Sequence, residues 1–393
     1  MDPLRIVVSG FIALLPAGGV AWDYIQYPLC LASLGHDVYY IEDTGLWPVY
    51  QLSQGDPGRV NAAYVASLMG AFGLTERWAF RDEARGVWYG KKAPEVTAIL
   101  ESADVFINLS CANVLRETYL RIPVRILVDT DPMFTQIQLE QHSGLTKGAG
   151  GLADDFVRYT HYFTFGENMS GPGCLVPGCG VEWHPTRQPV ALDWWADAGS
   201  APPDFVASTV MNWSATGEVR HDGRDWGQKS REWSLISDLP ASLPHCRFKV
   251  AVGQTAGDPF PVARARESGW TVLDANAAVP DWSSYRAFVS GSSAELSIAK
   301  HAYVAARTGW FSCRSACYLA AGRPVVLQDT GWSGHIGAGE GVLAFSTAEE
   351  ARDAMEQVAS DWARHARAAR AVAAEYFDGG TVLRTLLSDA GVA

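Results

Sequence analysis

Residues 308–328, TGWFSCRSACYLAAGRPVVLQ, place the clearest helix of the sequence directly before its clearest buried strand. Ser312 is a favourable N-cap, and a helix that starts there ends before Gly322, because glycine suits the position after a helix and Pro324 cannot continue one. The short apolar run that begins at Pro324 predicts a buried strand. A helix that leads into such a strand is the repeating unit of an α/β fold with a parallel sheet.

The N-terminal residues repeat this alternation. Residues 5–10 predict a short buried strand, residues 22–34 a helix closed by Gly35, and residues 37–43 a second strand. A strand, a helix and a strand within about 40 residues form a βαβ unit, whose crossover is right-handed and whose strands are parallel. The other elements expected in this half are a helix at 60–72 and strands at 103–109, 124–129 and 162–166.

A second α/β array occupies the rest of the sequence. A long final helix, with or without a break, is expected to start near Ser346, which can form a capping box with Glu349, and to run to about Phe377. Polar loops are expected at 212–228 and 291–295. The expected strands of this array lie at 204–211, 247–252, 270–274 and 324–328.

The Gly-, Pro- and Trp-rich segment 171–203 is expected to connect the two arrays. We therefore predict an α/β protein with two Rossmann-like domains that face a central cleft. The N-terminal domain is expected at 1–190, the C-terminal domain at 191–375 and a C-terminal tail at 376–393. Two sheet edges that face one another suit a reaction between two substrates.

The 393 residues include 31 Lys and Arg against 43 Asp and Glu, which gives a net charge of −12. A protein that follows a nucleic-acid backbone is normally basic, so nucleic acid is not the expected partner. Seven scattered cysteines do not form a disulfide framework, and no run of about 18 apolar residues predicts a membrane span. We expect a reduced, cytoplasmic protein. No cluster of His, Cys and Asp has metal-ligand spacing, so no metal site is expected.

The first turn of the helix after Ser312 is a candidate anion site. Its free backbone N–H groups and the positive end of the helix dipole favour a negative ligand. Arg314 adds a guanidinium in the same turn. An arginine at a helix N-terminus is locally unfavourable, so an anion would stabilise it. The alternative is an ordinary helix whose Arg314 faces solvent or an acidic neighbour.

Residues 320–331, AAGRPVVLQDTG, resemble the C-domain signature of GT-B glycosyltransferases, in which a strand, a loop and a helix hold the diphosphate of a nucleotide sugar. Gly18 and Gly19, followed by a helix and by residues 35–38, GHDV, resemble the opening of the same enzymes. The resemblance is most specific over residues 290–350. It implies a metal-independent glycosyltransferase with no tightly bound cofactor. The C-terminal domain would bind a nucleotide-sugar donor, and the N-terminal domain would bind the acceptor hydroxyl of a small molecule or glycan. A UDP-sugar is the expected donor, with GDP- and dTDP-sugars as alternatives.

The sequence departs from that family at two glutamates. Many retaining members carry two glutamates eight residues apart, and the equivalent positions here are Gly309 and Cys317, which cannot supply a carboxylate. Retention and inversion of the sugar configuration therefore both stay open. A catalytically silent nucleotide-sugar-binding protein and an NDP-sugar epimerase or hydrolase of the same fold stay rivals. The net charge argues against a DNA-modifying glycosyltransferase, and the missing G-x-G-x-x-G turn argues against an NAD-dependent oxidoreductase.

Glycosyl transfer needs positive charge at the leaving diphosphate and, in an inverting enzyme, a base for the acceptor hydroxyl. Asp23, expected in the first turn of the helix after Gly18 and Gly19, is the first candidate for the base. Asp131 and Glu167 follow predicted strands and are the other catalytic candidates. The residues expected at the donor diphosphate and sugar are Lys229, Glu295, Gly309, Ser312, Arg314, Ser315, Asp329 and Thr330, with Gly18 and Gly19 as a glycine loop.

Several of these candidates also have a purely structural interpretation. A carboxylate such as Asp23 suits the N-terminal end of a helix dipole, and Asp131, which precedes a proline, suits a turn. Glu295 suits a loop or the first turn of a helix, and Lys229 suits a solvated charged loop. Asp129, at the same strand end as Asp131, shares its two interpretations. Among the histidines, His335 is expected nearest to a ligand, because it lies in a Gly-rich loop.

Overall fold

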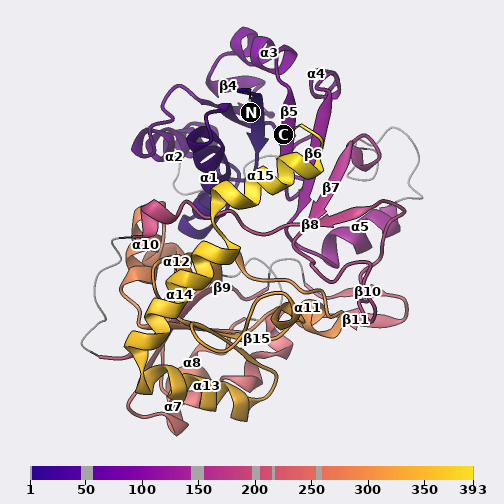
Figure 1. The fold of residues 1–393 in the computed structure, drawn as a ribbon. Helices are drawn as coiled ribbons and strands as arrows, with labels where there is room; N and C mark the ends of the chain where they lie inside the picture. The colour runs from indigo at the N-terminus through magenta and orange to yellow at the C-terminus, as the bar shows by residue number, and fades with distance from the viewer. Residues whose placement is uncertain are drawn as a thin grey trace.

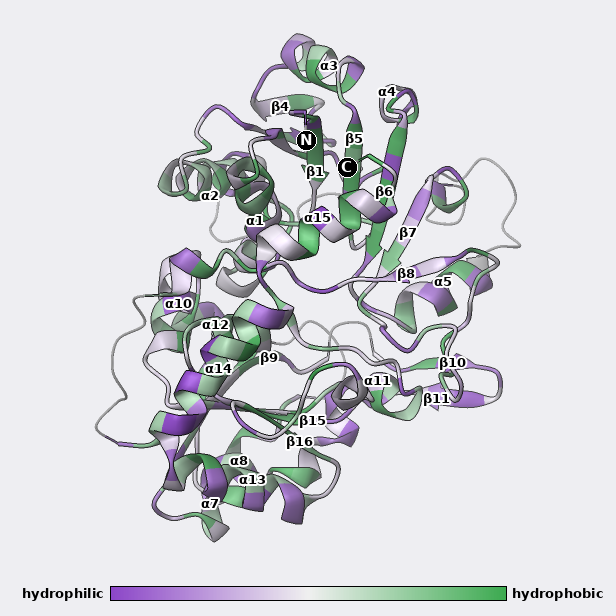
Figure 2. Cartoon of the chain, viewed as in Figure 1, coloured by the Kyte–Doolittle hydropathy of each residue, from purple (hydrophilic) through white to green (hydrophobic). Residues whose placement is uncertain are grey.

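The computed structural model describes residues 2–45, 56–142, 155–196, 204–214, 217–253 and 259–392. The chain forms two lobes, one above the other in Figure 1, and each lobe is a mostly parallel β-sheet covered by helices. Apolar residues concentrate in the strands and on the inner faces of the helices, as the colouring in Figure 2 shows. No helix within the described ranges is long and apolar enough to cross a membrane.

The upper lobe contains an eight-stranded sheet in the order β4-β3-β2-β1-β5-β6-β7-β8. Neighbouring strands are parallel except β3 and β4, which pair antiparallel at one edge. The predicted strands of this half are confirmed, with ends shifted by at most two residues. The strand bounds are β1 (Arg5–Ser9), β2 (Asp37–Glu42), β3 (Trp78–Asp82), β4 (Val87–Gly90), β5 (Val105–Leu109), β6 (Val124–Asp129), β7 (His161–Thr164) and β8 (Trp183–Pro185).

The helices that accompany this sheet in the first half of the chain include α1 (Gly18–Ser33), α2 (Pro57–Ala71), α3 (Ala93–Glu101), α4 (Glu117–Leu120) and α5 (Phe134–His142). The first helix starts four residues before its predicted beginning at Trp22. Gly18 and Gly19 therefore lie in the first turn of α1 and not in a glycine loop. Asp23 is the sixth residue of α1, so the prediction that placed it in the first turn was wrong.

The close approach of the two lobes explains why α1 begins with glycine. A Cβ added to Gly18 would lie 2.3 Å from the carbonyl oxygen of Asp281 in the lower lobe. The amide of Gly18 donates a hydrogen bond of 3.2 Å to the Val279 carbonyl, which satisfies one of the free donors at the start of α1. The N-terminus of α1 is thus capped by the other lobe.

The lower lobe contains a six-stranded parallel sheet in the order β13-β12-β9-β14-β15-β16. Its strands are β9 (Val206–Asn212), β12 (Arg247–Gly253), β13 (Trp270–Asp274), β14 (Ala294–Ser297), β15 (Val325–Gln328) and β16 (Val342–Phe345). Its helices are α7 (Leu239–Ser242), α8 (Val262–Glu267), α9 (Ala275–Ala278), α10 (Trp282–Ser290), α11 (His301–Ala305), α12 (Cys313–Ala320), α13 (Ala348–Ser360) and α14 (Trp362–Tyr376).

Polar sequence concealed regular structure at two places in this lobe, and a third prediction was off by one residue. The expected loop 212–228 contains an antiparallel hairpin, β10 (Val219–His221) and β11 (Arg224–Trp226). Glu295, expected in a loop or a first helical turn, is a buried residue of β14. The capping box of α13 uses Thr347 and Glu350, one residue beyond the predicted pair, because the helix starts at Ala348.

The chain crosses between the lobes twice. The first crossing leaves β8, passes Val190 and the short 3₁₀ helix η1 (Leu192–Trp195), and enters the lower lobe. The second crossing returns from α14 to α15 (Gly379–Asp389), which lies along α1 in the upper lobe (Figure 1). The Val190 amide donates a hydrogen bond of 2.8 Å to the Phe377 carbonyl, so the two crossings run side by side. The segment expected as a C-terminal tail contains this helix.

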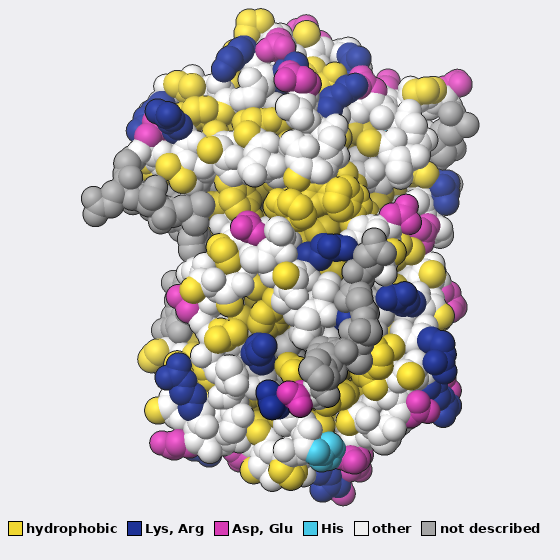
Figure 3. All heavy atoms as spheres, turned by 90° about the vertical axis from the view of Figure 1, so that its left-hand side faces the viewer, with side chains coloured by type: hydrophobic (Ala, Val, Ile, Leu, Met, Phe, Trp, Pro, Cys, Tyr) yellow, Lys and Arg dark blue, Asp and Glu magenta, His cyan; other side chains and the backbone are white. Residues whose placement is uncertain are grey.

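Aromatic side chains fill the seam between the lobes. Trp22 of α1 packs at 4.6 Å, between ring centres, on Trp195 of the first crossing, and its indole N–H donates a hydrogen bond to the Trp282 carbonyl of α10. Phe72 contacts both Trp194 and Trp282. Figure 3 shows apolar side chains gathered at the level where the two lobes meet on this side of the molecule. Four of the fifteen tryptophans therefore serve the contact between the lobes.

Candidate functional site

The carboxyl ends of β6 and β14 meet between the lobes. Lys300 follows β14, and its ammonium lies 2.8 Å from both carboxylate oxygens of Asp131, which follows β6. The Tyr303 hydroxyl donates a hydrogen bond to the same carboxylate. The Trp310 indole donates a further hydrogen bond of 3.1 Å to the Thr130 carbonyl. Asp131 therefore joins the upper lobe to the lower one.

Arg314 is the second residue of α12, and its guanidinium is turned back toward the sheet. Its Nε forms an ion pair with Glu295. One Nη donates a hydrogen bond of 2.7 Å to the Val210 carbonyl, and the other donates a hydrogen bond to the Ser297 hydroxyl. The sequence left open whether Arg314 binds an anionic ligand or faces solvent or an acidic neighbour. In this structure it has an acidic neighbour, Glu295. Glu295 is fully buried, and its second oxygen has no hydrogen-bond partner among the described residues.

Lys229, expected at the donor diphosphate with a solvated loop as the alternative, is buried with 7% of its surface exposed. Its ammonium donates one long hydrogen bond, 3.4 Å, to the Asn212 carbonyl at the end of β9. No carboxylate of the described residues lies within ion-pair distance of it. The pKa of Lys229 is lowered to about 7, chiefly by burial and in addition by the positive charges of Arg314 and Lys300, against the opposing carboxylates of Asp131 and Glu295.

These five groups form a charge cluster: Lys229, Lys300, Arg314, Asp131 and Glu295. Each carboxylate already holds one cation, Asp131 with Lys300 and Glu295 with Arg314. Lys229 is the cation left over. A buried ammonium without a counter-ion is costly, and an anionic ligand would remove that cost. The cluster is therefore a candidate anion site.

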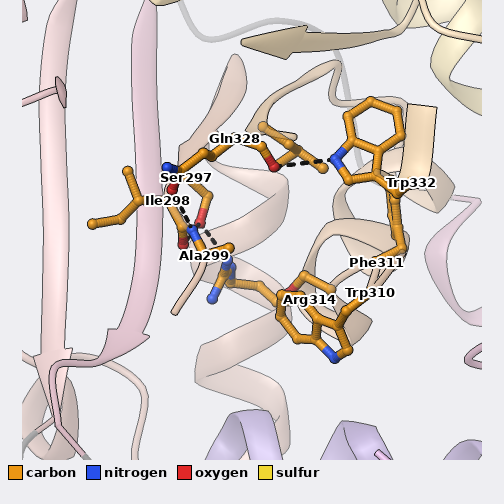
Figure 4. A pocket seen from close by; sticks show the side chains of 10 residues that line it. Ser297, Ile298, Ala299, Trp310, Phe311, Arg314, Gln328 and Trp332 are labelled. Atoms are coloured by element: carbon orange, nitrogen blue, oxygen red, sulfur yellow. Dashed lines mark hydrogen bonds between the residues drawn. The ribbon is translucent and has the colours of Figure 1, made fainter. Parts of the chain in front are cut away.

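A small cavity lies beside this cluster, at the N-terminus of α12 (Figure 4). Ser297, Trp310, Arg314, Gln328 and Trp332 are among its lining residues, and its volume is about 10 Å³. A cavity of this size holds roughly one water molecule. All of its lining residues belong to the lower lobe, and a diphosphate has to displace side chains to occupy it.

Asp23 approaches the N-terminus of α12 from the upper lobe. Burial raises the pKa of its carboxyl to about 7, against the opposing effects of the Arg314 charge and a hydrogen bond with the Cys313 thiol. A carboxylate that titrates near neutral pH can accept a proton and release it again. The side chain thus has the chemistry of a general base, although it lies one turn further along α1 than expected.

Other predicted site residues have local structural partners. Asp329 accepts hydrogen bonds from the Gly331 amide at 2.8 Å and the Ser333 hydroxyl at 2.7 Å, which closes the turn after β15. The Thr330 hydroxyl donates a hydrogen bond of 2.7 Å to the Trp310 carbonyl. Gly309 has a left-handed φ of 76° and packs against Asn168.

The remaining candidates are two serines of the α12 region and two carboxylates that have partners of their own. Ser312 is the N-cap residue of α12, as predicted. Ser315 is fully buried, and its hydroxyl has no hydrogen-bond partner in the part of the chain that the structure describes. Glu167 pairs with Arg187 through two contacts of 2.8 and 2.7 Å, away from the cluster. Asp129 is fully buried and accepts hydrogen bonds from Gln136 and Thr164.

Lys300, Tyr303 and Trp310 contribute to this region and were missed in the sequence. Lys300 stands three residues after the end of β14, so recognition of that strand would have placed it at the carboxyl edge of the sheet. The polar residues at 291–295 hid the strand. No group of three metal-ligating side chains occurs within the described ranges.

No protein-family model matches the sequence, and neither does any curated protein. Solved structures match it over nearly its whole length. Anabaena Alr3699/HepE, in complex with UDP and glucose, has a TM-score of 0.58 and 10% identity, covering 99% of this chain and 100% of that chain. An alpha-glucosyltransferase in complex with UDP and a 13-mer DNA has a TM-score of 0.56 and 11% identity, with 100% of both chains covered. AviGT4, a glycosyltransferase involved in avilamycin A biosynthesis, has a TM-score of 0.55 and 15% identity, with 99% and 97% covered.

Proposed function

Because the chain has the GT-B fold of these glycosyltransferases, we propose that it transfers a sugar from a nucleotide-sugar donor to an acceptor hydroxyl. The observation that carries the proposal is the buried ammonium of Lys229, which has no carboxylate partner among the described residues and stands beside Arg314 and Lys300. A diphosphate is an anion with enough charge to engage more than one of these cations.

The lower lobe is proposed to hold the donor. Lys229, Arg314 and the backbone amides after Ser312 would meet the charge that develops on the departing nucleoside diphosphate. Glu295 would then hold Arg314 in place from beneath. Side-chain cations would supply the positive charge in this arrangement, so we place the reaction among the metal-independent transfers. The sugar is proposed to lie toward Gly309, Asp329 and Thr330.

The upper lobe is proposed to hold the acceptor, with Asp23 as the base for its hydroxyl. Asp23 belongs to the upper lobe, lies near the N-terminus of α12 and has a pKa of about 7. Asp131 stands at the same edge and is proposed to contact the acceptor. The net charge of −12 favours a small molecule or glycan over nucleic acid as acceptor.

The first experiment measures thermal shifts of the whole protein with UDP, GDP, ADP, dTDP, CMP and NAD. A ligand that binds the native state raises the melting temperature by mass action. We expect a nucleoside diphosphate, UDP first, to give the largest shift, since two of the similar structures hold UDP. No shift with any nucleoside diphosphate would contradict the proposal. A shift with NAD alone would favour an oxidoreductase.

A second experiment separates transfer from its rivals. The nucleotide sugar that matches the bound diphosphate is incubated with the protein, and nucleotide release is measured with and without a panel of hydroxylated acceptors. Release that depends on the acceptor supports the glycosyltransferase. Release or epimerisation without an acceptor would identify a hydrolase or epimerase, and tight binding with no turnover would identify a silent binding protein.

A further inference from the structure

We propose that Lys300 exchanges partners as the site fills: it binds the Asp131 carboxylate while the site is empty and the donor diphosphate once the donor is bound. This inference rests on the proposed function. It adds to it a donor-binding residue, and it assigns Asp131 the role of an internal anion that occupies this cation until the donor arrives.

The geometry of the contact supports an exchange. Lys300 Nζ lies 2.8 Å from each oxygen of Asp131, so the carboxylate already occupies the place of a two-oxygen anion such as a phosphate. The Lys300 side chain is 12% exposed, and the Asp131 side chain is 38% exposed. The cation is therefore mostly buried, while its carboxylate partner is partly exposed to solvent.

The surroundings of Lys300 keep its ammonium in the site without Asp131. The ammonium lies 4.6 Å from the centre of the Phe134 ring and 5.1 Å from the centre of the Tyr303 ring. A lysine side chain is flexible along its four-carbon stem, so the ammonium can turn toward a new anion without a backbone change. Asp131 would keep the hydrogen bond from the Tyr303 hydroxyl after Lys300 has turned away.

The charges of the cluster favour the exchange. Before the donor binds and with Lys229 protonated, three cations face two carboxylates, which leaves the cluster with one positive charge in excess. A diphosphate linkage is doubly negative. If it bound while Lys300 stayed paired with Asp131, the three cations would face four negative charges. After Lys300 turns to the diphosphate, the three cations contact only Glu295 and the two phosphates, and Asp131 is held by the Tyr303 hydroxyl. The balanced arrangement is the one in which Lys300 has changed partner.

The exchange has a consequence for the acceptor. Asp131 loses its cation when the donor binds, so the upper lobe gains an unpaired carboxylate beside the place where a sugar hydroxyl arrives. An acceptor hydroxyl can then donate a hydrogen bond to Asp131. The donor is therefore expected to bind first, and the empty site is expected to bind the acceptor weakly.

The test compares dissociation constants for UDP, or for whichever of GDP, ADP and dTDP binds in its place, by calorimetry. Lys300→Met is expected to weaken binding by about tenfold or more, because a cation of the site is lost. Asp131→Asn is expected to tighten binding by about threefold or more, because the competing carboxylate is gone while the hydrogen-bonding shape is kept. A salt bridge with only a structural role predicts that both variants weaken binding or leave it unchanged, and either result would overturn the exchange.

Matched controls and a second readout keep the test decisive. Lys91→Met and Glu76→Gln remove the charges of an exposed ion pair and are expected to leave the dissociation constant unchanged. If Asp131→Asn does not fold, Lys300→Met is titrated with uridine and with UDP. Loss of affinity for UDP alone supports the exchange, and equal loss for both contradicts it. If the wild-type protein binds none of the nucleoside diphosphates, the proposed function fails. If it binds one and Lys300→Met binds equally well, only this inference fails.

Discussion

Lys229 is the residue on which the interpretation of the site depends most. Its pKa falls from 10.5 in a free side chain to about 7 in the folded protein, chiefly because the side chain is buried. Unfolding therefore takes up a proton between these two values, and stability is expected to rise with pH from about 7 to about 10. The contribution is present at high pH and is lost as the pH falls through 7.

Lys229→Met is expected to stabilise the ligand-free protein at pH 7 by roughly 1–3 kcal/mol and to remove this rise of stability with pH. Denaturant unfolding at several pH values measures both effects. The same variant is expected to weaken nucleoside diphosphate binding. Lys91→Met, at an exposed ion pair, serves as the control and is expected to change stability little. A less stable Lys229→Met protein would show that Lys229 has an anionic partner in the folded chain.

Asp23 makes the stability of the protein fall as the pH rises, which is opposite to the effect of Lys229. Its folded pKa of about 7 lies above the free value of 3.8, so its contribution to stability is present below pH 3.8 and lost as the pH rises to 7. Asp23→Asn is expected to lower kcat by about 100-fold or more and to leave the nucleotide dissociation constant within about threefold of wild type. The rise of the wild-type rate through pH 7 is expected to disappear.

The control for Asp23→Asn is Asp204→Asn, which removes a surface carboxylate paired with Arg247. It is expected to leave the pH–rate profile unchanged. An Asp23→Asn enzyme with full activity would remove Asp23 as the base and leave Asp131 as the candidate in the upper lobe.

At the scale of elements, the contact between α1 and α10 depends on Gly18. Gly18→Ala would bring a Cβ to within 2.3 Å of a backbone oxygen, which has to move. We expect a loss of about 1–3 kcal/mol in the free energy of unfolding, with a smaller contact between the lobes. Gly70→Ala is the matched control, because an added Cβ there meets nothing within 4 Å. It is expected to stabilise α2 by up to about 1 kcal/mol. Equal effects of the two variants on the melting temperature would contradict this account.

Strands and helices with strong local signals were predictable from the sequence, and elements held by distant partners were not. The strand that ends at Gln328 was clear because it is apolar and follows a glycine and a proline. By contrast, Glu295 looked like a loop residue, since the arginine that allows its burial in β14 stands nineteen positions later. The start of α1 was misjudged because Gly18 and Gly19 favour loops, and their packing against the other lobe cannot be read locally.

The candidate site was predictable to the same limited extent. Lys229, Arg314 and Asp131 were chosen for their chemistry and for their positions after strands or at a helix start, and the fold brings these three into one cluster. The pairing of Arg314 with Glu295, and of Asp131 with Lys300, is a tertiary property. Glu167 was chosen by the same rule, yet it faces Arg187 instead. The end of a strand fixes the edge of the sheet but not the partner of a side chain.

At the scale of the whole molecule, the last helix returns to the upper lobe. α15 lies on α1, and Leu387 is fully buried in the core cluster that also contains residues of α1. Leu387→Ala is expected to cost about 2–4 kcal/mol of stability. Hydrogen exchange is expected to accelerate in α1 as well as in α15, although α1 lies far away in the sequence. Ser388→Ala, on the exposed side, is expected to change stability by less than about 0.5 kcal/mol. Faster exchange confined to α15 would show that the helix does not support the upper lobe.

The return of α15 to the upper lobe also constrains how the protein is made. A ribosome releases α1 among the first elements, but it releases α15 only after every strand of the lower lobe. The apolar surface of α1 that α15 covers therefore stays open throughout synthesis, and the first half of the chain cannot mature on its own as domains often do. The upper lobe therefore finishes folding only when α15, which is translated after the lower lobe, packs onto α1.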